Sequence, residues 1–105
     1  MVDERYIRRM VSIARKVVRN EGRNVVHEYA TDRDGSLWIN QTFGNQRIEI
    51  SYVSVITPSG YFDHEVNINH DGDEVFFYDF SDDEPLITDD RNWERELFSL
   101  ERRLL

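Results

Sequence analysis

The stretch NHDGDEVFFYDFSDDE, residues 69–84, contains seven carboxylates and four aromatic side chains but no Lys or Arg. Carboxylates at this density suit three kinds of chemistry, namely coordination of a divalent cation, general acid–base catalysis, and attraction of a cationic partner. Each kind requires a different arrangement of neighbouring residues. The rest of the sequence therefore discriminates between them.

Calcium coordination is the first alternative, because the residues NINHDGDE resemble the start of an EF-hand loop. Asn67, Asn69 and Asp71 occupy the first, third and fifth loop positions. The twelfth position, which requires a bidentate Glu, is Tyr78. Both flanks alternate as strands do, so we interpret the segment as a β-hairpin in which Asp71 and Gly72 form a type I′ turn.

Other metal, nucleophilic or acid–base sites find no support. The DRDG turn at residues 32–35 fails as a metal loop in the same way, and the absence of Cys removes thiolate chemistry. The histidines His27, His64 and His70 are too scattered for a zinc motif, and the phase of His64 favours a half-buried position in a sheet. No Ser lies in a nucleophile elbow, and residues 82–84 fall in a predicted loop where water keeps their carboxylates ionised. We therefore expect no enzymatic activity, no metal and no cofactor.

The net charge of −8 is unevenly distributed along the 105 residues. Residues 1–23 carry +4, residues 24–70 carry −4, residues 71–90 carry −9, and residues 91–105 carry +1. The length fits a single domain covering residues 1–105, and the 39% hydrophobic content suffices for a core. The N-terminus has no signal-peptide pattern and no run approaches the roughly 20 apolar residues of a membrane span, so we expect a cytoplasmic protein.

The elements that must position the acidic segment follow from hydrophobic periodicity. Apolar residues recur with a 3.6-residue period over residues 6–18, which predicts an amphipathic helix that Asp3 and Glu4 favour at its start and Gly22 at its end. The period then changes to two, which predicts strands over residues 25–30, 36–43, 47–57, 61–68 and 74–80. Their short connections predict an antiparallel meander.

A second helix is expected near the C-terminus. Thr88 or Asp89 can serve as its N-cap, after a break at residues 82–85. Its apolar stripe is formed by Trp93, Leu97, Leu100 and Leu104. The sequence thus predicts an α+β fold of the order α-β-β-β-β-β-α, with both helices on one face of the sheet.

The basic side of the first helix, over residues 5–19, suggests nucleic-acid or membrane binding as alternatives. Its apolar stripe has the width of an ordinary core contact, and no aromatic residue lies among the basic ones. The net charge of −8 also repels a polyanion at long range. We therefore interpret this side as solvated, and expect neither a membrane nor a nucleic acid as a direct partner.

The acidic segment has features that simple solubility does not require. Alternation predicts that the two faces of its strand are formed by Glu74, Phe76, Tyr78 and Phe80 and by Val75, Phe77 and Asp79. Large apolar groups on both faces indicate a strand that is covered on both sides or meets a partner. Nine like charges within residues 71–90 also destabilise the folded chain by self-repulsion, which interleaved Lys would prevent.

These observations favour a rigid acidic surface that imitates the phosphates of a nucleic acid. Carboxylates on one face of a strand recur every ~6.6 Å, while duplex DNA carries one charge per ~1.7 Å of its axis. Phe76, Tyr78 or Trp38 could supply apolar anchors. The predicted contact residues are Asp71, Asp73, Glu74, Phe76, Tyr78, Asp79, Asp82, Asp83, Glu84, Asp89 and Asp90.

In its architecture and its acidic segment, the chain resembles the small acidic anti-CRISPR proteins encoded by phages. The resemblance implies a stoichiometric, non-enzymatic inhibitor that occupies the basic groove of a nuclease, such as a CRISPR effector, in the cytoplasm of the host cell. One alternative is an immunity protein or antitoxin that blocks a basic nuclease toxin, and a third possibility is an enzyme whose pocket forms only in three dimensions. The basic helix departs from a uniformly acidic mimic and leaves a two-faced binder or a homodimer open.

Overall fold

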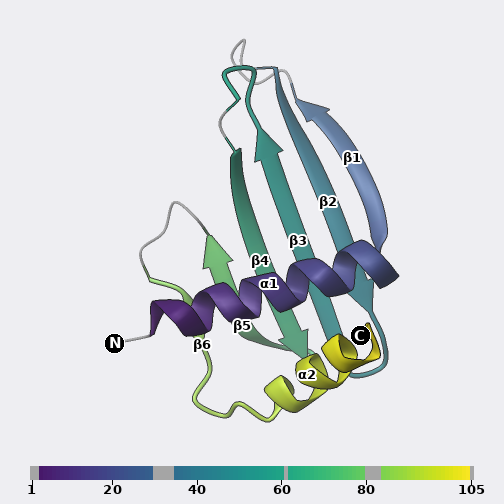
Figure 1. The fold of residues 1–105 in the computed structure, drawn as a ribbon, viewed down its shortest axis with the longest axis vertical. Helices are drawn as coiled ribbons and strands as arrows, with labels where there is room; N and C mark the ends of the chain where they lie inside the picture. The colour runs from purple at the N-terminus through teal and green to yellow at the C-terminus, as the bar shows by residue number, and fades with distance from the viewer. Residues whose placement is uncertain (1–2, 30–34, 61, 80–83, 105) are drawn as a thin grey trace.

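The computed structural model describes residues 3–29, 35–60, 62–79 and 84–104 (Figure 1). Its elements, in chain order, are α1 (Glu4–Glu21), β1 (Arg23–Tyr29), β2 (Ser36–Gly44), β3 (Ile48–Ile56), β4 (Phe62–His70), β5 (Asp73–Asp79), β6 (Leu86–Ile87) and α2 (Trp93–Arg103). The predicted α+β class, the five long strands and both helices are confirmed.

The strands form one antiparallel sheet in the order β1-β2-β3-β4-β5-β6, so every neighbour in space is also a neighbour in sequence. Type I′ geometry at the β4–β5 turn is supported by positive φ angles of 51° at Asp71 and 87° at Gly72. The short strand β6 was not predicted. It pairs Ile87 with Phe76 and Leu86 with Phe77, and so extends the sheet beyond β5.

Helix α1 begins and ends as its sequence indicates. The carboxylate of Asp3 accepts a hydrogen bond of 2.9 Å from the backbone N–H of Arg5, which caps the first turn. Gly22 ends the helix in an extended conformation. A Cβ atom at this position would lie 2.6 Å from the carbonyl oxygen of Val18 and would also clash with that of Thr42, so the passage from α1 into β1 requires glycine.

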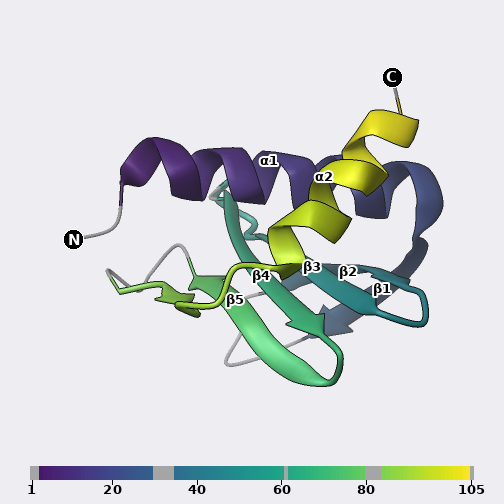
Figure 2. The same ribbon diagram turned by 90° about the horizontal axis from the view of Figure 1, so that it is seen from below.

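Both helices cover the same face of the sheet, as predicted, and leave the other face open (Figure 2). The central layer of the core is a row of side chains that crosses β3, β4 and β5, where Ile50 pairs with Ile68 and Ile68 with Phe76. From the helices, this layer is covered by the buried residues Met10, Ile13, Ala14, Val17, Val18, Trp93, Leu97 and Leu100. The predicted stripe of α2 is thus confirmed for its first three members, while Leu104 is only partly buried.

A β-bulge in β5 overturns the predicted face of Glu74, while Phe76 and Tyr78 share one face and Phe77 and Asp79 the other, as predicted. Glu74 pairs with Asn69, but Phe76 pairs with the adjacent Ile68, so Val75 is an extra residue on β5. The bulge shifts the alternation by one position. Phe76 therefore faces the helices, whereas Glu74 lies on the open face, where its carboxylate accepts a hydrogen bond from the side-chain amide of Asn67.

The predicted N-cap of the second helix was also wrong. Helix α2 begins at Trp93, after Asn92, rather than near Thr88 or Asp89. The backbone N–H of Thr88 instead donates a hydrogen bond of 3.0 Å to the carbonyl of Val75, which continues the pairing of β6 with β5. Thr88 therefore takes part in strand pairing, although its preference for N-cap positions had predicted that it begins the helix.

Candidate binding surface

The open face of the sheet is acidic. Asp63 and Glu65 lie two positions apart on β4 and therefore point to the same side, and Glu65 is directly opposite Asp79 on β5. Glu49 and Glu74 lie on this side too, because both pair with Asn69. We call these five residues, Glu49, Asp63, Glu65, Glu74 and Asp79, the acidic face.

No basic residue interrupts the strands that carry the acidic face. The sequences of β2, β3, β4 and β5 contain neither Lys nor Arg. At the opposite edge of the sheet, Arg23 on β1 pairs with Thr42 and so comes to the same side. The carboxylates are therefore concentrated towards β4 and β5.

Apolar side chains lie beside these carboxylates. Trp38 pairs with Val55, and Val53 pairs with Glu65 in the next row of the sheet. Together with Asp63 and Asp79 they line a hollow of about 190 Å³. A half-buried Trp next to negative charge provides both an apolar contact and electrostatic attraction for an incoming cationic group.

The carboxylates of the acidic face repel one another. Burial raises the pKa of Glu65 above its ordinary value of 4.5, and the charges of Asp79 and Asp63 raise it further. Like charges directly opposite each other on neighbouring strands are destabilising. A cationic partner at this face would relieve that repulsion.

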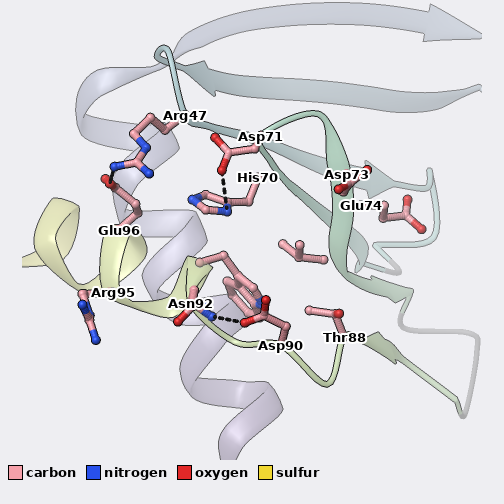
Figure 3. Close-up of a pocket in the computed structure, with 12 residues that line it drawn as sticks. Arg47, His70, Asp71, Asp73, Glu74, Thr88, Asp90, Asn92, Arg95 and Glu96 are labelled. Atoms are coloured by element: carbon pink, nitrogen blue, oxygen red, sulfur yellow. Dashed lines mark hydrogen bonds and ion pairs between the residues drawn. The ribbon is translucent and has the colours of Figure 1, made fainter.

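Four of the predicted contact residues, one of which also belongs to the acidic face, line a groove of about 500 Å³ on the helix side of the sheet (Figure 3). Asp71, Asp73 and Glu74 come from the β4–β5 hairpin, and Asp90 from the segment before α2. Glu74 contacts this groove at its edge, since its carboxylate bonds to Asn67 on the open face. The hairpin thus joins the groove to the acidic face.

Charges inside the groove are partly neutralised. Arg47 and Glu96 form an ion pair of 3.2 Å that ties the β2–β3 connection to α2. Nδ1 of His70 lies 3.6 Å from the carboxylate of Asp71, and Asp90 accepts a hydrogen bond of 3.3 Å from the backbone N–H of Asn92. The groove is therefore less suited than the acidic face to attract a cationic partner.

The remaining predicted contact residues are dispersed. Phe76 has an exposed fraction of 0% and packs beside Trp93 with the ring centroids 6.0 Å apart, so it cannot serve as an anchor for a partner. Tyr78 is half-buried and faces α1 rather than the open side. Glu84 and Asp89 are exposed, while Asp82 and Asp83 lie outside the described residues.

Three bases of α1 have carboxylate partners within the helical layer. Arg8 forms an ion pair of 2.7 Å with Glu4, and Arg9 and Lys16 each lie 3.6 Å from a carboxylate oxygen of Glu101 on α2. The two pairs with Glu101 join α1 to α2 on the side of the sheet away from the acidic face. The structure thus has a mainly basic helical side and an acidic open side.

Three residues of the acidic face, Glu49, Asp63 and Glu65, were not predicted as contact residues. They lie outside the dense run of acids and belong to strands that contribute one or two carboxylates each. Alternation carries the relevant signal, since Asp63 and Glu65 are out of phase with the buried residues Val66 and Ile68. The register between strands then brings them beside Asp79.

Comparison with known proteins does not assign the chain to a family. A scan against protein-family models, a search of curated proteins and a search of solved structures each found no match. Among the described residues, neither helix combines the length and apolar character that crossing a bilayer requires. The function is therefore inferred from the surface chemistry of the chain.

Proposed function

We propose that this protein is a non-enzymatic inhibitor that binds a nucleic-acid-binding protein, such as a nuclease, through its acidic face. The observation that carries the proposal is the group formed by Asp63, Glu65 and Asp79, in which like charges face each other beside the half-buried Trp38. This arrangement costs folding free energy, and a cationic surface that binds there would offset that cost.

The geometry of the sheet suits imitation of a phosphate backbone. Neighbouring strands are spaced ~4.8 Å apart and same-face residues ~6.6 Å apart, so the carboxylates form a regular, backbone-supported array. A groove that accommodates phosphates through Lys and Arg can bind such an array in the same way. Because the sheet is already ordered, little conformational entropy is lost on binding.

The proposed target is a CRISPR effector nuclease, and the site of action is the cytoplasm of the host cell. A nuclease toxin with a basic active site would accept the same surface, as in an immunity protein. DNA cleavage by a panel of effector nucleases and nuclease toxins, titrated with this protein, separates the two. Stoichiometric inhibition that excess DNA relieves supports the proposal, and the class of enzyme inhibited identifies the target. Inhibition of no member of either class would contradict it.

A further inference from the structure

A second hollow, of about 370 Å³, lies between α1 and the helix-facing side of the sheet. Helix α1 crosses the strands here, and the far ends of β2, β3 and β4 extend beyond it (Figure 1). The hollow is lined by Glu4, Ile7, Arg8, Val11, Ser12, Arg15, Tyr52, His64 and Tyr78. It is separated from the acidic face by the sheet itself.

Arg15 gives this hollow its charge. Its Nε atom is buried and has no hydrogen-bond partner among the described residues. The other base in the hollow, Arg8, is already paired with Glu4 at 2.7 Å. A buried N–H without an acceptor costs ~1–3 kcal/mol, so a guanidinium in this position is prepared for an anionic group.

Aromatic rings form part of the wall of the same hollow. The rings of Tyr52 and His64 are stacked, with centroids 5.8 Å apart and an interplanar angle of 9°, and Tyr78 lies 5.7 Å from His64 on its other side. Burial lowers the pKa of His64, and Arg15 acts in the same direction, whereas Asp63 and Asp79 from the neighbouring side of the sheet raise it. A neutral imidazole leaves Arg15 as the positive group that faces a ligand.

We propose that this hollow binds a small aromatic anion, with a carboxylate or phosphate group on Arg15 and a flat ring against the aromatic wall. The volume is within the range of small-molecule pockets, and the combination of one charged donor with apolar walls is typical of them. A guanidinium binds both kinds of oxyanion through paired N–H groups. The site is independent of the acidic face, and its ligand has the opposite charge from the partner proposed there.

The overall charge of −8 does not exclude such a ligand. At physiological ionic strength the Debye length is ~8 Å, so exposed carboxylates farther away than this are largely screened from the hollow, while Asp63 and Asp79 still act on His64. The proposal therefore predicts binding that depends on Arg15 itself rather than on the net charge of the protein.

The test uses isothermal titration calorimetry of the full chain with two aromatic anions, AMP and 4-hydroxyphenylacetate. Their uncharged analogues, adenosine and 4-hydroxyphenylacetamide, serve as matched ligands. We expect saturable binding of at least one anion, about 10-fold or more tighter than that of its uncharged analogue. Failure of both anions to bind at millimolar concentration, or equal binding of an anion and its analogue, would overturn the proposal. AMP and 4-hydroxyphenylacetate also distinguish a phosphate from a carboxylate ligand.

Two variants localise the site. Arg15→Gln removes the guanidinium without breaking an ion pair within the described residues, and should weaken binding about 10-fold or more. Arg19→Gln makes the same change in charge one turn later, at an exposed position outside the hollow, and should leave binding unchanged. Equal effects of the two variants would show that binding follows net charge and would reject the assignment to Arg15. Ring NMR signals of His64 and Tyr78 should shift on titration, and their constancy would likewise reject it.

Discussion

Glu65 on β4 and Asp79 on β5 are directly paired across the sheet, so two carboxylates of like charge face each other. Asp63 adds a third charge two positions away on β4. Such a pairing opposes folding. The strand nevertheless keeps its register, because its other face carries core residues that a shift of one position would expose. The scaffold thus holds the carboxylates together against their repulsion, as a preorganised binding surface requires.

Removal of the central charge should stabilise the free protein. Glu65→Gln is expected to raise the free energy of unfolding by up to ~0.5 kcal/mol at pH 7, since both carboxylates remain partly in water. The corresponding rise in the thermal midpoint is roughly 2–4 °C. Thermal unfolding followed by circular dichroism checks this value.

The same variant has a defined pH dependence. Because the pKa of Glu65 is raised in the folded protein, its ionised carboxylate lowers the free energy of unfolding at pH values above that pKa. This loss of stability disappears as the pH falls towards the ordinary pKa of 4.5. The advantage of Glu65→Gln should therefore shrink between pH 7 and about pH 4. A difference that stays constant or grows on acidification would show that repulsion is not its cause.

The bulge at Val75 predicts opposite outcomes for two adjacent phenylalanines. Phe76→Ala should lower the free energy of unfolding by ~3–5 kcal/mol, because it opens a cavity beneath Trp93 in the core. Phe77→Ala, on the open face, should cost ~1 kcal/mol or less. Urea denaturation measures both, and a larger loss for Phe77→Ala would place the bulge elsewhere.

At Gly22 the end of α1 passes close to the backbone of β2. Gly22→Ala should destabilise the protein by ~1–3 kcal/mol, because its Cβ would meet the carbonyl oxygens of Val18 and Thr42. Gly44→Ala is the matched control, since its Cβ would be 3.7 Å from the nearest atom, an ordinary contact with the side chain of Glu49. Equal midpoints of the two variants in urea would refute the close approach.

Hydrophobic periodicity predicted most of the fold, because each long helix or strand places its apolar side chains at regular intervals facing one core. For this reason the sequence predicted helix α1, the apolar stripe of α2 and five strands. Strand β6 was not, because two residues are too few to show a period, and it forms only by pairing with Phe76 and Phe77. The bulge was missed because one extra residue changes the phase without changing the composition.

The binding surface was harder to predict than the fold. The run of acids in residues 71–90 was visible in the sequence, but its members separate in space, with Asp71 and Asp90 at the groove and Asp79 on the open face. The acidic face is instead assembled from three strands by their register. Proximity along the chain therefore indicated the charge of the surface but not its location.

Charge reversal on the acidic face tests the central proposal most directly. Asp63→Lys combined with Glu65→Lys is compared with the wild-type protein and with a single reversal, Asp89→Lys, at an exposed position outside the acidic face. The measurement is the concentration that inhibits half of the DNA cleavage by the target nuclease, at low and at physiological salt. The account predicts a loss of inhibition of at least ~100-fold for the double variant, a small change for Asp89→Lys, and a salt dependence that is weaker in the double variant. Unchanged inhibition by the double variant, or an equal loss from Asp89→Lys, would contradict it.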